Sequence, residues 1–225
     1  MKLRKRLSMV ASFVRQGGVI ADIGTDHAYL PAYLILKGVC DNAYAADIGK
    51  GPLLNAKETV EEYDLEDKIK LVLSDGLKNV PLEKTDTVVL AGMGGDLIRD
   101  ILSYPDIDCL RKLHIIAQPQ SHSEKVRLFF MNNGFEIERE DICLDSKHIY
   151  ICMSAVFTGR TDYPDSYEYY GELIKNESEL VGEYLGLQLM HMKKKRDAFL
   201  KSGCEKDAQA LGNVIANIEK AMGER

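Results

Sequence analysis

The segment IADIGTDHAYLP, residues 20–31, decides how this chain is interpreted. It begins as an apolar run typical of a buried strand and ends as the start of a helix, because proline is tolerated in a first helical turn. Two carboxylates, Asp22 and Asp26, lie between them together with His27. In open α/β sheets, ligands bind outside the carboxyl ends of the strands. We therefore expect the functional site at this turn.

Strand and helix patterns alternate from residue 19 to residue 157, after a basic amphipathic helix near the N-terminus. This alternation is typical of a doubly wound α/β sheet. The first five apolar runs are nearly continuous, which indicates parallel strands covered on both faces. We predict five parallel strands (19–24, 43–48, 68–76, 86–95 and 112–119), four helices (28–38, 51–64, 96–103 and 123–134) and a terminal antiparallel pair (135–145 and 147–157).

The sequence changes character after Thr158. Residues 159–171 have the composition of a linker. Apolar residues then recur at a spacing of three and four, which predicts two helices packed as an antiparallel, coiled-coil-like hairpin. We expect one domain over residues 1–158 and a helical domain over residues 159–225. The predicted seam of the hairpin consists of Tyr170, Leu173, Leu180, Tyr184, Leu187, Ala208, Leu211, Ile215, Ile218 and Met222.

Composition limits the classes of protein that the chain can represent. It has 225 residues and a formal net charge of −6, which disfavours a purely electrostatic nucleic-acid binder. The five cysteines are scattered without a C-x-x-C motif, which indicates reduced thiols. No histidine has clustered partners at metal-ligand spacing, so we predict no metal. We find neither a signal peptide nor a membrane-spanning stretch, and we expect a cytoplasmic protein with no membrane partner.

Two basic clusters stand out against this acidic average. Such clusters either face solvent on helices or contact a phosphate backbone, and charge alone leaves both interpretations open. The first cluster contains Lys2, Arg4, Lys5, Arg6 and Arg15, and the second is the run Lys193, Lys194, Lys195 and Arg196.

The turn after the first strand argues against a phosphate-containing cofactor. A dinucleotide site needs a G-x-G-x-x-G turn, whereas this turn has one glycine followed by Asp26, whose carboxylate would repel a pyrophosphate. The sequence also contains no P-loop motif. A nucleoside that carries cationic groups and no phosphate fits the acidic turn better.

Carboxylates also follow the second and third predicted strands. Asp47 can accept hydrogen bonds from both hydroxyls of a ribose, and it follows Asp22 at a spacing close to that of ribose-binding acids in related folds. Asp75 can accept from an adenine amine, while the N–H of Gly76 can donate to the ring. S-adenosylmethionine fits these groups, with Asp22 and Gly24 under its amino-acid end. Each acid alone also reads as a helix cap or a turn residue.

The motifs DIGTDHAYLP, AADIGKGPL, SDGL, LAGMGG and AQPQ together resemble the bacterial tRNA (adenine-N1)-methyltransferases that act on adenine 22 of the tRNA D-arm. This resemblance implies a Rossmann-like class I methyltransferase fold followed by a C-terminal coiled coil. It also implies S-adenosylmethionine as the cofactor and tRNA as the substrate. The implied cofactor-binding residues are Asp22, Gly24, Asp26, His27, Asp47, Ile48, Asp75 and Gly76, with Gly92 and Met93 beside the transferred methyl group.

Methyl transfer to N1 of adenine requires no general base, because this ring nitrogen is neutral and has a free lone pair. We therefore expect catalysis by positioning, and by a carboxylate that stabilises positive charge developing on the base. Asp26 is the candidate for this charge, His27 for a substrate or cofactor contact, and Tyr29 for stacking on the base. The predicted tRNA-binding residues are Lys5, Arg6, Lys193, Lys194 and Arg196 for phosphates, and Gln118 and Pro119 for the border of the base pocket.

Two other functions remain open at this stage. The same sheet edge would serve a methyltransferase that acts on another RNA or on a small molecule, because a fold does not determine the substrate. A non-catalytic RNA-binding scaffold would use the helical hairpin and would have no need of the cofactor acids. A monomer is the default expectation for the chain.

Overall fold

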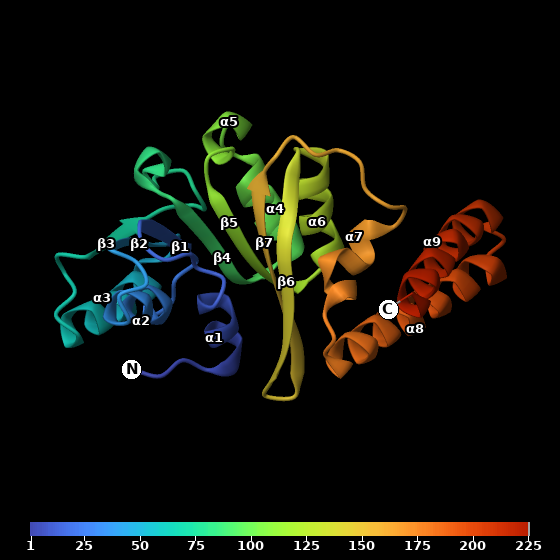
Figure 1. Cartoon of the computed structure of the whole chain (residues 1–225), viewed down its shortest axis with the longest axis horizontal. Helices are drawn as coiled ribbons and strands as arrows, with labels where there is room; N and C mark the ends of the chain where they lie inside the picture. Colours follow the sequence, from blue (N-terminus) through green and yellow to red (C-terminus); the bar gives the residue numbers. More distant parts are fainter. Residues whose placement is uncertain (225) are drawn as a thin grey trace.

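In the computed structural model, which describes residues 1–224, seven strands form one sheet in the order β3-β2-β1-β4-β5-β7-β6 (Figure 1). The first five strands are parallel, whereas β7 is antiparallel to β5 and to β6. Five parallel strands and a terminal antiparallel pair were expected from the sequence, and this prediction is confirmed. The strands are β1 (Val19–Ile23), β2 (Asn42–Asp47), β3 (Ile69–Leu73), β4 (Thr87–Gly94), β5 (His114–Ser121), β6 (Phe135–Asp145) and β7 (His148–Phe157).

Helices cover both faces of the sheet, and a separate core lies under each set. Successive residues of a strand point to opposite faces, so Val88 and Leu90 of β4 enter one core while Val89 enters the other. The first core lies under α4 and α6, and the second lies under α1, α2 and α3. The elements that precede β6 are α1 (Lys5–Ala11), α2 (Tyr29–Leu36), α3 (Lys50–Glu62), the 3₁₀ turn η1 (Leu82–Lys84), α4 (Gly95–Ser103), α5 (Ile107–Leu110) and α6 (Ser123–Asn132).

The predicted linker is wrong for its last residues, because Tyr167 and Tyr170 are buried in the first core. They form the short helix α7 (Tyr167–Tyr170), which continues into the 3₁₀ turn η2 (Gly171–Lys175). The tyrosines look like polar linker residues in the sequence, but their rings supply apolar surface to the core where α7 packs on α6, and η2 packs on β6.

A buried ion pair lies beneath this segment. Arg127 Nε of α6 donates to Glu140 Oε1 of β6 at 2.8 Å, and both side chains are fully buried. The other carboxylate oxygen accepts from the backbone N–H of Leu173 at 3.0 Å. Gly171, with φ +57°, lies so close that a Cβ atom would collide with both side chains. This pair therefore connects the C-terminal segment to the sheet.

The final two helices, α8 (Glu179–Lys201) and α9 (Glu205–Gly223), form the predicted antiparallel hairpin. On α9, Ala208, Ile215 and Ile218 are buried as expected. On α8 the buried residues are instead Val181, Leu185 and Leu189, one or two positions away from the predicted seam, while Leu187 is exposed. Tyr170 and Leu173 precede α8 altogether. The domain boundary at residue 158 stays a prediction.

The buried pair generates a stability prediction. Glu140→Leu leaves the Arg127 guanidinium buried without its partner, so we expect the free energy of unfolding to fall by about 3–5 kcal/mol. The double variant Arg127→Met/Glu140→Leu removes both charges and should recover most of this loss. Urea unfolding of both variants measures the effect.

The matched control is Glu138→Leu, which breaks the exposed pair between Arg15 and Glu138 and should cost less than about 1 kcal/mol. Equal urea midpoints for Glu140→Leu and the wild type would show that the buried pair contributes nothing to stability.

Candidate active site

A cavity of about 680 Å³ opens at the carboxyl ends of the parallel strands. This volume lies within the usual range for small-molecule sites. The β1–α2 loop forms its floor, and the N-terminal segment forms a second wall together with Ala91 of β4 and Tyr63 after α3. Its lining residues are Met1, Lys2, Leu3, Arg4, Arg6, Leu7, Asp22, Gly24, Thr25, Asp26, His27, Ala28, Tyr29, Leu30, Tyr63 and Ala91.

Asp22 carries the buried charge of this cavity. Burial raises the pKa of its carboxyl from 3.8 to about 6, and the nearby Asp47 adds to the rise. A hydrogen bond from the Thr25 hydroxyl and the positive charge of Arg6 act in the opposite direction. A cationic ligand in the cavity would therefore stabilise the charged form of the Asp22 carboxylate.

The loop above Asp22 adopts a conformation that suits a close approach of ligand to backbone. Gly24 has φ +76°, and a Cβ atom there would collide with the Met93 methyl group. Ala28 also has a positive φ, +51°, and its N–H donates to Thr25 Oγ1 at 3.1 Å. The turn is thus compact, with Met93 packed directly against it, and α2 begins immediately afterwards.

The three predicted catalytic residues form a continuous row at the cavity rim. Asp26 Oδ2 lies 3.4 Å from His27 Nε2, and the His27 ring stacks on the Tyr29 ring at 4.9 Å with an angle of 5° between the planes. Asn55 of α3 donates to the other Asp26 oxygen at 3.4 Å. The Asp26 side chain is 69% exposed and Tyr29 is 45% exposed, so both are available to a ligand.

Arg6 links the N-terminal wall to the ends of β4 and β5. Its Nη1 donates to the buried Gln118 Oε1 at 2.7 Å, and the same nitrogen packs against Gly92. Pro119 follows Gln118 on β5, and the pairing of β4 with β5 is irregular from Ala91 to Gly94. Such bulges are frequent next to active sites, where they redirect side chains. Gln118 is fully buried, and neither it nor Pro119 lines the cavity, which Gln118 meets only through Arg6.

The acids after β2 and β3 lie outside this cavity, further along the same sheet edge. Asp47 Oδ1 accepts from the Gly49 N–H at 2.7 Å, and the neighbouring Ile48 is 70% exposed. Asp75 pairs with Lys78 at 2.6 Å, while Gly76 packs against Ile101 of α4. The structure thus brings six residues together in the cavity and leaves four of the predicted cofactor-binding residues outside it. Those inside are Asp22, Gly24, Asp26, His27, Tyr29 and Arg6, and those outside are Asp47, Ile48, Asp75 and Gly76.

Comparisons with known proteins identify the family of this chain. The Methyltransferase domain family matches residues 3–153. A tRNA (adenine(22)-N(1))-methyltransferase of Bacillus subtilis (strain 168) is 33% identical over 221 residues, which cover 98% of this chain and 87% of that protein. This chain belongs to the tRNA (adenine(22)-N(1))-methyltransferase family.

Solved structures show the same relationship. The tRNA methyltransferase TrmK of B. subtilis superposes with a TM-score of 0.89 at 27% identity, covering 98% of this chain and 99% of that one. TrmK of M. capricolum, solved in complex with S-adenosyl-homocysteine, gives a TM-score of 0.85 at 27% identity, with 99% of each chain covered. The sheet of this family member is therefore the Rossmann-like sheet expected from the sequence.

The second basic cluster lies far from the cavity of this methyltransferase-family chain. Figure 1 places α8 and α9 at the end of the molecule opposite to the N-terminus. Lys193 pairs with Glu219 at 2.6 Å and Arg196 pairs with Asp197 at 2.8 Å, which leaves Lys194 of the predicted set exposed without an ion pair among residues 1–224. Two of these three predicted phosphate ligands are thus already neutralised within the hairpin.

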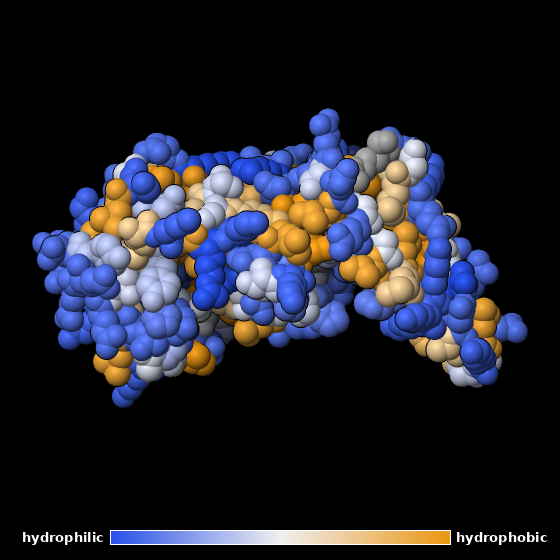
Figure 2. All heavy atoms as spheres, turned by 90° about the horizontal axis from the view of Figure 1, so that it is seen from below, coloured by the Kyte–Doolittle hydropathy of each residue, from blue (hydrophilic) through white to orange (hydrophobic). Residues whose placement is uncertain are grey.

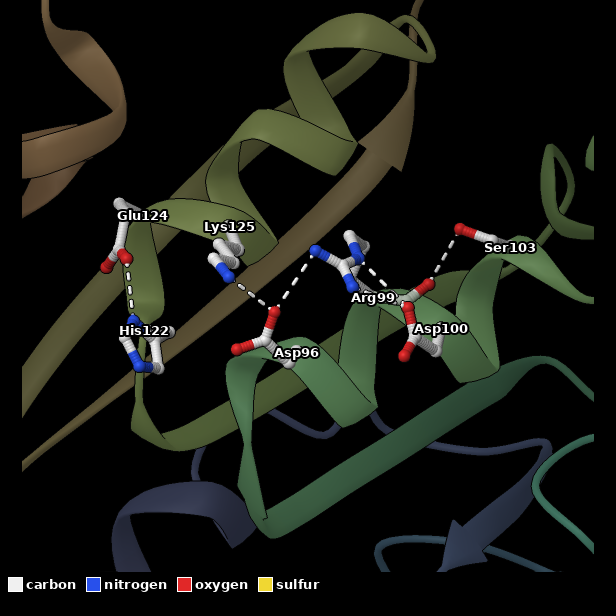
Figure 3. A network of polar contacts seen from close by, with 7 residues as sticks. All are labelled: Asp96, Arg99, Asp100, Ser103, His122, Glu124 and Lys125. Atoms are coloured by element: carbon white, nitrogen blue, oxygen red, sulfur yellow. Dashed lines mark hydrogen bonds and ion pairs between the residues drawn. The ribbon is translucent and has the colours of Figure 1, made fainter.

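A polar network connects the helices beside the predicted methyl-transfer loop (Figure 3). Asp96 at the start of α4 pairs with Lys125 of α6 at 2.6 Å and with Arg99 at 3.1 Å. Gly95 lies so close to the backbone of His122 that a Cβ atom would collide with it. These contacts hold the starts of α4 and α6 together. The network is exposed, and its ion pairs contribute little each.

Some features of the site were not predicted. Tyr63 was missed, because it belongs to no motif and reaches the cavity only through the fold. Thr25 lies within the motif DIGTDHAYLP, but it was given no role there. Lys2 and Arg4 belonged to a recognised basic cluster, but nothing in the sequence indicated that they line the cavity. Residues 1–224 contain no cluster of histidine, cysteine or acidic residues that could hold a metal ion. None of the helices in this range is long and apolar enough to cross a membrane.

The buried Asp22 predicts a pH dependence of stability. The folded pKa of about 6 exceeds the ordinary value of 3.8, so the folded state holds this proton more tightly than the unfolded state. Asp22 should therefore lower the free energy of unfolding as pH rises from about 4 to about 6, by roughly 3 kcal/mol at most. Asp22→Asn should gain stability relative to the wild type over this range.

Urea unfolding at pH 4 and pH 7 measures this difference, and Asp67→Asn, which changes an exposed carboxylate, serves as the control. If the difference between Asp22→Asn and the wild type is the same at both pH values, Asp22 does not titrate in this window.

Proposed function

We propose that this chain transfers a methyl group from S-adenosylmethionine to N1 of adenine 22 in tRNA. The observation that carries this proposal is one cavity with a buried carboxylate, Asp22, in its floor and the row Asp26, His27 and Tyr29 at its rim. Membership in the family supports the same reaction.

The residues present fit the cofactor. A cavity of about 680 Å³ can hold part of a nucleoside with an amino-acid chain, and Asp22 can balance its cationic groups. The Gly49 N–H is bonded to Oδ1 of Asp47, and the carboxylate can also accept from ribose hydroxyls. The exposed Ile48 next to it offers apolar surface to a base. When bound, S-adenosylmethionine supplies a methyl group on a sulfonium centre.

The chain acts on the target adenine mainly by positioning it. Alignment of two reactants can contribute about 7–11 kcal/mol to catalysis. Tyr29 extends the stack that begins at His27, so a flipped adenine can stack on it, which is worth about 1–3 kcal/mol per base. The base must be unpaired or flipped, because pairing hides N1.

Asp26 supplies the electrostatic contribution. Positive charge moves onto the adenine as N1 is methylated, and a carboxylate near the ring stabilises it. Asp26 is held by His27 and Asn55 and is open to solvent. Its effect grows when the bound base excludes water, because a lower local dielectric strengthens the interaction. Gln118 and Pro119 lie at the end of β5 and border the site behind Arg6.

The decisive measurement is methyl transfer from labelled S-adenosylmethionine to unmodified tRNA transcripts, followed by nucleoside analysis. We expect 1-methyladenosine at position 22 and no product on a transcript with guanosine there. Labelled 6-methyladenosine or 1-methyladenosine elsewhere in the tRNA would contradict the proposed reaction. Absence of cofactor binding in calorimetry would favour a non-catalytic scaffold.

Asp47→Ala tests the cofactor assignment separately. Loss of hydrogen bonds to a charged acceptor costs about 1.5–3 kcal/mol, so the Kd for S-adenosylmethionine should rise roughly 10- to 150-fold. Calorimetry measures the Kd, and Asp67→Ala, which removes an exposed acid outside the cavity, is the control. An unchanged Kd in Asp47→Ala would remove this residue from the cofactor site.

A further inference from the structure

The β6–β7 hairpin extends beyond the sheet as a two-stranded arm. β5 pairs with β7 only from Ile115 to Ala117, opposite Ala155 to Met153. The pairing of β6 with β7 continues for five more residues of β7, down to the pair Asp145 and His148. We call residues 142–151 the arm. Figure 1 shows its turn beyond the sheet edge, at the same end of the molecule as α1 and the N-terminus.

The N-terminal segment braces this arm. The Arg6 N–H donates to Asp145 Oδ2 at 3.0 Å, and the Arg6 guanidinium lies 5.8 Å from the centre of the Tyr150 ring. Nearer the sheet, Arg139 Nη1 of β6 donates to the carbonyl of Ser12 at 3.1 Å. An isolated two-stranded hairpin is marginally stable in water. The arm and α1 therefore form a single wall beside the cavity.

The turn at the arm tip has an unusual backbone. Ser146 has φ +49° and Lys147 has φ +70°, which is the pattern of a tight hairpin turn that usually contains asparagine and glycine. A lysine with positive φ is strained relative to glycine. Local strain of this kind concentrates at functional sites. The turn presents the exposed Lys147 side chain at the outermost point of the arm.

The cations of this wall are free. Among residues 1–224, no acidic side chain lies within ion-pair distance of Lys2, Arg4, Lys5 or Lys147, and all four are exposed. Lys2 and Arg4 also line the cavity. Asp145 is the acid beside them, and its carboxylate already accepts hydrogen bonds from Arg6 and Ser146. Figure 2 views the molecule from this end and shows hydrophilic side chains standing out beside an apolar band.

We infer that the arm and the N-terminal segment form one phosphate-binding wall that holds the tRNA backbone while the target adenine occupies the cavity. Lys147 at the arm tip contacts a phosphate that lies further from the target base than those contacted by Lys2, Arg4 and Lys5. This inference rests on the proposed function, because it takes tRNA as the substrate. It assigns RNA binding to residues 142–151, in addition to the basic N-terminal segment.

The test is tRNA binding by Lys147→Gly as a function of salt concentration. Glycine suits the positive φ of this position, so the variant removes the charge without straining the fold. Affinity for tRNA should fall about three- to tenfold near 0.1 M salt, and the slope of log K against log salt should become shallower by about one. Lys147→Arg keeps the charge and should retain wild-type binding.

Lys112→Gln is the matched control, because Lys112 is an exposed lysine without an ion pair among residues 1–224. It precedes β5 and so lies at the amino ends of the parallel strands, away from the arm. It should leave affinity and slope unchanged, and all three variants should bind S-adenosylmethionine as the wild type does. Wild-type affinity and slope in Lys147→Gly would overturn the inference. A different result would contradict the proposed function but support the phosphate-binding wall. In that result Lys147→Gly weakens tRNA binding as expected, yet the wild-type enzyme forms no 1-methyladenosine.

Discussion

A carboxylate buried at the end of a strand lowers the stability of the fold unless other groups stabilise it. The arrangement of the site around Asp22 reflects this constraint. Burial disfavours the charged form, so the surrounding groups must compensate. Thr25 donates a hydrogen bond to it from the next turn, and Arg6 brings positive charge from a different part of the chain. The compact Gly24 turn and the N-terminal segment therefore both contribute to stabilising the same buried charge. The charge of Asp22 in the cavity floor thus interacts with Arg6 in the wall that we propose binds the RNA.

The parallel strands were predictable from the sequence, because both of their faces are buried. Parallel strands covered on both faces must be apolar along their whole length, so the five β-strands were visible as runs in the sequence. The helical hairpin was predicted, but the docking of α7 and η2 on the sheet was not. Their anchor is an ion pair between Arg127 and Glu140, two charged residues that a sequence-based argument assigns to the surface. The seam of α8 was misplaced for a related reason, since α8 packs on β6 as well as on α9.

The candidate site was predictable where residues follow strand ends. Asp22, Asp26 and His27 belong to one continuous motif, and the parallel sheet brings the ends of its strands to one edge. Contacts across the fold gave no such signal. The bond between Arg6 and Gln118 joins residues 112 positions apart, and Tyr63 reaches the cavity from the end of α3. A sequence motif can indicate which residues bind the ligand. The residues that close the cavity depend on packing between elements that are distant in the sequence, which a motif does not show.

The distribution of charge explains how an acidic chain can bind a polyanion in one orientation. Two cations of α8, Lys193 and Arg196, are paired within the helical hairpin, whereas Lys2, Arg4, Lys5 and Lys147 have no ion pair among residues 1–224. A phosphate backbone gains most from cations that have no other partner, because no existing ion pair must be broken. The acidic remainder of the surface repels the same backbone. Free cations on one wall and negative charge elsewhere thus orient the RNA with its target adenine toward the row that begins at Asp26.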